Sequence, residues 1–253
     1  MTWMKISRKQ QLVLVVCLVS AAGLAAAALR LRPWSDVRRI RTDGIRSYYV
    51  CSGAEAGREK KLPAIIIIGH ALSSPYKDLS AFQDKFDEPL LLIWSGVVSG
   101  LALNTRVDDE AIWARVRQQF PKLLDDYKAK LRIDEDRIYL TGFSAAGVYA
   151  WMLAYDRPEL YAGVVPMSAT SYPRQIQGNL DAAKAVATIW VRGEEDDTPP
   201  QNLEAEKQTG RIVEASNPHS RFVLKQGEGH RDMGKYWLEN LQYVLQFRRN
   251  DGR

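Results

Sequence analysis

The sequence is poor in the residues that build metal clusters and disulfide frameworks. Its 253 residues include two cysteines and three histidines. Cys17 lies in a long apolar run and Cys51 in a strand-like one, so the pair has neither the spacing of a zinc site nor that of a disulfide scaffold. Both are expected to be small buried hydrophobic residues. No metal site is expected.

Acidic residues are absent from residues 1–32, which carry five Lys and Arg. The formal net charge of +5 therefore arises in this segment, and the rest of the chain holds 30 basic and 30 acidic residues. Binding to a phosphate backbone draws on a clustered surplus of Lys and Arg, and no DNA- or RNA-binding motif is present. No nucleic-acid partner is expected.

An uncharged run of 18 residues, 12–29, follows Lys5, Arg8 and Lys9. A basic start, an apolar centre and small residues towards the end are typical of a signal peptide, and 18 residues also just suffice for a membrane span. Residues 1–29 are therefore predicted to be a signal peptide or membrane anchor that forms an apolar helix before the domain. The body would be secreted, periplasmic or attached to a membrane through 12–29. Arginines beyond the run outnumber the charges before it, so the orientation stays open.

The rest of the chain divides into a predicted linker, 30–44, and one α/β domain, 45–250. The apolar runs 65–68 and 90–93 lack alternation, as expected for strands that helices cover on both faces. Predicted strands are 46–52, 64–69, 90–94, 137–141, 162–167, 187–191 and 221–225. Predicted helices are 109–131, with an interruption at Pro121, and 146–155, 201–214 and 233–247. This alternation predicts a mainly parallel, doubly wound sheet.

The segment Gly142-Phe143-Ser144-Ala145-Ala146-Gly147 joins a predicted strand to a predicted helix. A serine nucleophile at such a turn has a strained backbone, and the residues two before and two after it must be small. Gly142 and Ala146 meet this need, although Ala146 stands where glycine is more usual. Ser144 is the predicted nucleophile, and the alternative is a serine that only caps the helix.

A serine hydroxyl needs a base, and the candidates are His70, His219 and His230. His219 lies in a polar turn and is given no role. His230 lies in Gly-Glu-Gly-His, between the last strand and the last helix, and is the predicted base. His70 is interpreted as an orienting residue.

Four consecutive acidic residues, 194–197, follow the strand before that of the base. Asp196 is the predicted third member of a triad because it stands three residues after Gly193 and four before Pro200. Asp197 is the alternative. The chain order Ser, Asp, His is typical of α/β-hydrolases and differs from that of chymotrypsin and subtilisin.

A tetrahedral intermediate needs two backbone N–H donors. One is predicted at Ala145, directly after the nucleophile. The other is predicted after the strand 64–69, at Leu72 or else Ala71. Trp94 ends a strand on the same edge, and either lines the acyl site or packs in the core.

With these residues in place, the chain resembles the polyhydroxybutyrate-depolymerase and feruloyl-esterase-like branch of the α/β-hydrolases, over about 44–247. The matching pieces are the opening strand 44–50, the serine turn 137–147, the acid loop 193–200 and Gly229-His230. The resemblance implies cleavage of small-molecule or polymer carboxylic esters by acylation of Ser144, without a metal or organic cofactor. Ala71 and Ala146 depart from the glycines usual in this family.

Two other functions fit the same fold. One is a serine peptidase of the prolyl-oligopeptidase type, and the other is a membrane-tethered binding protein that has lost catalysis. Only about 17 residues, 169–185, lie between two predicted strands where a cap domain would be inserted. A minimal cap and an open site are therefore expected, which suit an exposed ester.

Overall fold

One eight-stranded sheet organises the chain from Arg38 onward. The structure is a computed structural model that describes residues 36–42, 44–52, 60–69, 73–98, 109–196, 203–249 and 251. The strands are β1 (Arg38–Ile40), β2 (Ser47–Ser52), β3 (Leu62–Ile68), β4 (Leu90–Ser95), β5 (Ile133–Phe143), β6 (Gly163–Met167), β7 (Ala187–Gly193) and β8 (Arg221–Lys225). The α-helices are α2 (Pro75–Phe82), α3 (Glu110–Lys130), α4 (Ala145–Asp156), α5 (Arg174–Gln177), α6 (Leu203–Ser216) and α7 (Trp237–Val244). The 3-10 helices are η2 (Pro158–Leu160), η3 (Leu180–Lys184) and η5 (His230–Tyr236).

The strands lie in the order β1-β2-β4-β3-β5-β6-β7-β8. β2 is antiparallel to both of its neighbours, and all pairs from β4 to β8 are parallel. The prediction of a mainly parallel sheet is thus confirmed, with an antiparallel edge that the sequence had not indicated. Parallel strands end on one common edge, so the loops after β3, β5, β6, β7 and β8 meet there.

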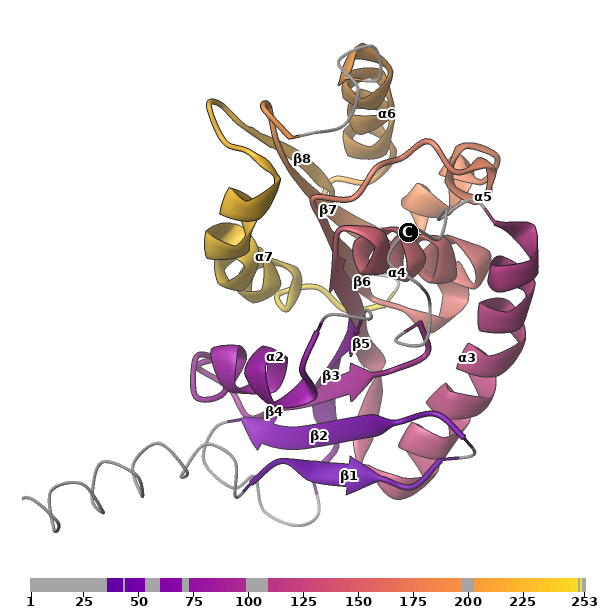
Figure 1. Cartoon of the computed structure of the whole chain (residues 1–253), viewed down its shortest axis with the longest axis vertical. Helices are drawn as coiled ribbons and strands as arrows, with labels where there is room; N and C mark the ends of the chain where they lie inside the picture. The colour runs from indigo at the N-terminus through magenta and orange to yellow at the C-terminus, as the bar shows by residue number, and fades with distance from the viewer. Residues whose placement is uncertain are drawn as a thin grey trace, which may run out of the picture. The chain divides into compact units, whose positions relative to one another are not determined.

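Helices cover both faces of the parallel part of the sheet. In Figure 1, α2 and α7 lie on one face and α3 and α4 on the other. Alternate β5 side chains face the two layers: Ile138 and Leu140 join the core cluster with α3 and α4, whereas Thr141 Oγ1 accepts a hydrogen bond from Trp237 Nε1 of α7 at 2.7 Å. Burial on both faces explains why β3 is apolar throughout and β4 is apolar up to Trp94.

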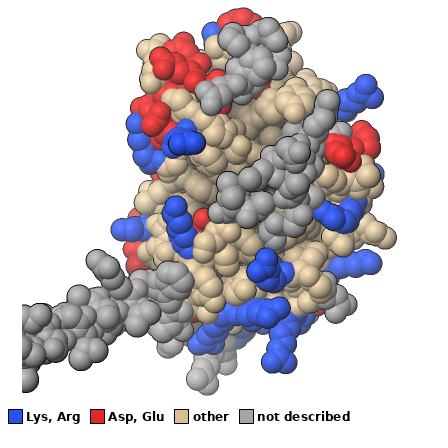
Figure 2. Space-filling model, in the orientation of Figure 1, with Lys and Arg blue, Asp and Glu red and all other residues tan. Residues whose placement is uncertain are grey.

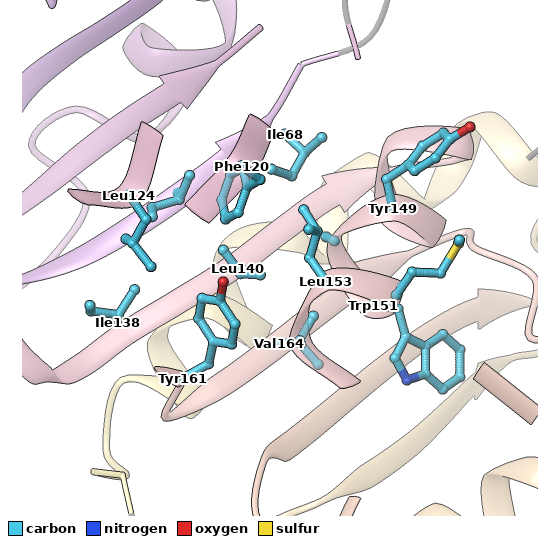
Figure 3. Close-up of a cluster of buried hydrophobic side chains, with 14 of the residues drawn as sticks. Ile68, Phe120, Leu124, Ile138, Leu140, Tyr149, Trp151, Leu153, Tyr161 and Val164 are labelled. Atoms are coloured by element: carbon cyan, nitrogen blue, oxygen red, sulfur yellow. The ribbon is translucent and has the colours of Figure 1, made fainter. Parts of the chain in front are cut away.

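Among the described helices, α4 is the most buried, since every residue from Ala146 to Tyr155 is enclosed. Figure 3 shows its Tyr149, Trp151 and Leu153 among side chains of the sheet and α3. The Trp151 and Trp190 ring centroids lie 4.8 Å apart. Burial of each large apolar side chain contributes about 1.5–3 kcal/mol, so this packing holds the start of α4 firmly.

Three local features differ from the sequence predictions. β1 lies within 30–44, the predicted linker. The strand was not predicted because it is short and carries two arginines without an apolar pattern. α3 continues through Pro121, because its buried stripe, which includes Phe120 and Leu124, outweighs the loss of one helical hydrogen bond. Cys51 is exposed rather than buried, since it occupies an outward position of β2.

Lys and Arg gather in the lower part of Figure 2, where Figure 1 places β1 and β2. Arg38, Arg39, Arg41 and Arg46 are exposed there. Charged side chains on an edge strand discourage pairing with another chain.

The apolar segment 12–29 and the proposed helix within it lie outside the described residues. The pattern of contacts within the chain separates residues 1–37 from residues 38–253. Among the residues that the structure describes, no helix is both long enough and apolar enough to cross a membrane.

Candidate active site

Ser144 occupies a strained turn between β5 and α4. Its backbone has φ 57° and ψ −129°, outside the regions that L-residues readily adopt. The turn is held on both sides, because Ser144 N–H donates to Met167 O at 2.8 Å and Val148 N–H donates to Ser144 O at 3.1 Å. Ser144 is partly exposed and the following residue, Ala145, is exposed. Strain of this kind, retained by surrounding packing, is typical of a nucleophile elbow.

Close packing around the turn explains the small residues of the sequence pattern. A Cβ on Gly142 would lie 2.5 Å from the carbonyl carbon of Ala146. A Cβ on Gly147 would lie 2.7 Å from Gly142 O. Ala146 itself is fully buried. Glycine is therefore required at 142 and 147, while an alanine is accommodated at 146, the position where glycine is more usual.

The structure brings His230 and Asp196 into direct contact. His230 Nδ1 lies 2.8 Å from Asp196 Oδ1. The Asp196 side chain is 3% exposed and the His230 side chain 30% exposed, so the carboxylate is enclosed and the imidazole reaches solvent. Asp196 Oδ2 is also buried, and no hydrogen bond to it is found within the described part of the chain. An enclosed carboxylate that holds Nδ1 of a partly open imidazole is the arrangement of an orienting acid and a base.

His230 also packs against the residue before Ser144. The Phe143 and His230 ring centroids are 5.2 Å apart, with the rings edge to face. Ser168, which follows β6 and has a positive φ of 46°, donates a hydrogen bond from Oγ to the His230 carbonyl oxygen at 3.2 Å. The ends of β5 and β6 thus both contact the loop that carries His230. No sequence pattern indicated the contact made by Ser168.

The loop that carries Asp196 is packed closely on the loop of His230. A Cβ on Gly193 would lie 2.1 Å from Glu228 O. Glu195 N–H donates to the same carbonyl oxygen at 3.0 Å. Gly193 is therefore needed for the close approach that places the acid beside the base.

A buried ion pair lies at the base of the acid loop. Arg192, at the end of β7, contacts Glu206 of α6, and each side chain is 2% exposed. Thr170 Oγ1, from the loop after β6, donates to Glu206 Oε1 at 2.7 Å. Burial raises the pKa of Glu206, opposed by the Thr170 hydrogen bond and the Arg192 charge. The pair connects the two ends of the segment that holds Asp196, and no local sequence pattern marked either residue.

The remaining candidates divide between described and undescribed residues. Ala145 begins α4, so its backbone N–H lies at a helix N-terminus. Leu72, Ala71, His70 and Asp197 lie outside the described residues, and their predicted roles stay predictions.

Two other residues considered from the sequence have packing roles. Trp94 is 2% exposed and donates from Nε1 to Asp78 Oδ2 at 3.0 Å. Its ring covers Gly69, where a Cβ would lie 2.1 Å from it, which favours the core interpretation over the acyl site. His219 stacks on Phe247, with ring centroids 4.1 Å apart. Among the described residues, no group of three or more His, Cys, Asp or Glu is arranged to hold a metal ion.

The strand order, the strained serine after β5 and the loops after β7 and β8 define the α/β-hydrolase class. The model of the family described as "Putative esterase" matches residues 50–250, and the chain belongs to this family. Membership indicates a carboxylic ester hydrolase. No protein of curated function matches the sequence significantly.

Solved structures with the same fold include esterases and a peptidase. A thermostable esterase is 16% identical, with a TM-score of 0.62 over 85% of this chain and 64% of its own. A ferulic acid esterase of the anaerobic fungus Anaeromyces mucronatus is 12% identical, with a TM-score of 0.62 over 83% of this chain and 89% of its own. An acylaminoacyl peptidase of Pyrococcus horikoshii is 11% identical, with a TM-score of 0.59 over 83% of this chain and 40% of its own. The chain thus spans less than two thirds of the first and third structures. Identities this low show a common fold alone.

Proposed function

We propose that this protein is a serine hydrolase that cleaves carboxylic esters through an acyl-enzyme on Ser144, with His230 as general base and Asp196 as the orienting acid. The observation that supports this proposal most strongly is the 2.8 Å contact between His230 Nδ1 and Asp196 Oδ1, in a loop that packs on Phe143 beside the strained Ser144. Membership of an esterase family agrees with this chemistry.

In the proposed reaction, the Ser144 hydroxyl attacks the ester carbonyl carbon while His230 Nε2 accepts its proton. The Asp196 carboxylate accepts a hydrogen bond from Nδ1–H, which fixes the tautomer and stabilises the imidazolium. The Ala145 N–H donates to the oxyanion, and Leu72 or Ala71 is the proposed second donor. His230 then gives its proton to the departing alkoxide oxygen. Water, activated by His230, hydrolyses the acyl-enzyme.

The direct test is hydrolysis of p-nitrophenyl butyrate by the wild type and by Ser144→Ala, His230→Ala and Asp196→Asn. Each substitution is expected to lower kcat by about 10³-fold or more, because the triad members act as a unit. Ser216→Ala is the matched control, since Ser216 Oγ donates to Ile212 O, four residues earlier in α6. Circular dichroism checks that each variant is folded. Undiminished hydrolysis by folded Ser144→Ala would overturn the proposal.

The same preparation separates ester from amide cleavage. The wild type is expected to hydrolyse p-nitrophenyl butyrate with a much larger kcat/KM than an acylated amino-acid p-nitroanilide. A larger value for the anilide would instead identify a peptidase. Turnover of neither substrate by folded protein would favour the binding protein.

A further inference from the structure

A cavity of about 410 Å³ opens beside the candidate active site, between α2 and the η5–α7 segment. Its walls include Phe82 from α2 and Trp237 from α7, and Ile68 and Phe143 lie at its sheet side. Figure 1 shows α2 and α7 on the same face of the sheet. A cavity with apolar walls of this size can hold a small organic group.

The cavity adjoins the side of the site on which His230 lies. Phe143 directly precedes Ser144, and its ring contacts both the His230 ring, at 5.2 Å, and the Trp237 ring, at 6.1 Å, between centroids. Arg231, which directly follows His230, also lines the cavity. In the proposed reaction the departing oxygen must lie near His230 to receive its proton, so the alcohol portion of the ester lies on this side.

Two cationic side chains and one carboxylate line the cavity. Lys77 and Arg231 line it and are exposed. Neither makes an ion pair with any described residue. The carboxylate in the lining, Asp78, accepts a hydrogen bond from Trp94 Nε1 at 3.0 Å. Two cations beside an apolar wall complement a group that is apolar in its body and anionic at its end.

We propose that this cavity receives the alcohol portion of the ester, and that Lys77 and Arg231 select substrates whose alcohol portion carries a carboxylate. This inference rests on the proposed function. The aromatic side chains Phe82, Phe143 and Trp237 pack against the body of the alcohol portion. The two cations attract its charged end, and the attraction weakens as salt screens it.

The test compares two acetate esters of similar size and shape, 4-acetoxybenzoate and 4-acetoxybenzamide, of which the first carries a negative charge at the far end of the leaving phenol and the second is neutral. The wild type is expected to have the larger kcat/KM for the benzoate. This selectivity should fall about threefold in Lys77→Met or Arg231→Met and about tenfold in the double variant, since exposed charge pairs contribute modestly. It should also fall in 0.5 M NaCl.

Arg115→Met is the matched control, because Arg115 is an exposed cation of α3, on the opposite face of the sheet. Its selectivity is expected to equal that of the wild type. Selectivity unchanged in the folded double variant would overturn the inference, as would a preference for the benzamide. Turnover of p-nitrophenyl butyrate but of neither acetoxy ester would also overturn it while leaving the proposed function intact. Absence of turnover of every ester would mean that the proposed function itself fails.

Discussion

At the scale of single residues, the candidate site depends on positions where no side chain fits. Gly142 and Gly147 allow the turn at Ser144 to close, and Gly193 allows the acid loop to touch the carbonyl of Glu228. These contacts are made with backbone atoms, which cannot rotate away as a flexible side chain would. A methyl group at any of the three positions must move a loop.

Gly193→Ala is expected to separate the loops of Asp196 and His230. We expect kcat/KM for p-nitrophenyl butyrate to fall about tenfold to a hundredfold, because a displacement of about 1 Å is enough to misalign reacting groups. The free energy of unfolding should fall by about 1–3 kcal/mol. Steady-state kinetics and urea denaturation measure the two effects.

Gly227→Ala is the comparison variant for Gly193→Ala. Gly227 has a φ of +67°, and no described atom lies within 4 Å of a Cβ built there. Its substitution should cost about 1 kcal/mol of backbone strain and leave kcat/KM near that of the wild type. Equal kinetics for Gly193→Ala and Gly227→Ala would show that the contact with Glu228 does not align the site.

The candidate triad could be predicted from the sequence because each member stands beside a local signal. Ser144 lies between a strand and a helix with small neighbours, and His230 follows the last strand after a glycine. Arg192 and Glu206 could not be predicted, because a buried ion pair between a strand and a helix leaves no spacing to recognise. The exposure of Cys51 was missed because a cysteine fits either face of a strand.

At the scale of elements, α6 is joined to β7 by a buried ion pair rather than by apolar packing alone. Arg192 precedes the segment that contains Asp196 and Glu206 follows it, so the ion pair joins the two ends of this segment. Breaking a buried pair leaves an uncompensated charge, which is much more costly than losing an exposed pair. The attachment of α6 should therefore depend on both residues together.

Arg192→Met and Glu206→Leu are each expected to lower the free energy of unfolding by about 3–5 kcal/mol, and the double variant by much less. Urea denaturation of the four proteins gives the coupling energy. The control is the same double-mutant cycle on the exposed pair Glu204–Lys207 of α6, whose Oε1 and Nζ atoms are 2.7 Å apart. Its coupling energy is expected to be about 0.5 kcal/mol. Additive losses at 192 and 206 would contradict a coupled pair.

Elements with long apolar runs were predicted well, and short polar ones were not. β3 and β4 carry continuous apolar residues, and both lie where the sequence placed them. β1 has three residues, two of them arginine, and α2 has eight residues, of which Leu79 and Phe82 are buried. Neither offers a periodic pattern long enough to recognise, so tertiary packing decides their structure.

At the scale of the whole molecule, buried tyrosines make the fold sensitive to alkaline conditions. Burial raises the pKa of Tyr155 to about 12, and its hydroxyl pairs with Thr188 Oγ1 at 3.1 Å. Burial likewise raises the pKa of Tyr139 to about 12. The reference value for both is 10.0. The folded state thus favours the neutral phenol over the ionised phenolate at both tyrosines.

Stability is expected to be unaffected by these groups below pH 10 and to fall as pH rises from 10 through 12, because the unfolded chain ionises first. Each of the two tyrosines is expected to lower the free energy of unfolding by about 2–3 kcal/mol across this pH range. Urea midpoints at pH 9 and pH 11.5 measure the loss. Tyr155→Phe removes one ionisable group and should show a smaller loss between the two pH values than the wild type. An equal loss would contradict the assignment to Tyr155.

The central claim is that Ser144 is an activated nucleophile. A fluorophosphonate probe, followed by mass spectrometry of the peptides, tests it most directly. The account predicts one adduct, on Ser144, that is absent in Ser144→Ala and forms far more slowly in His230→Ala. Folded wild-type protein that takes up no probe, or that carries the adduct on another serine such as Ser168, would contradict it.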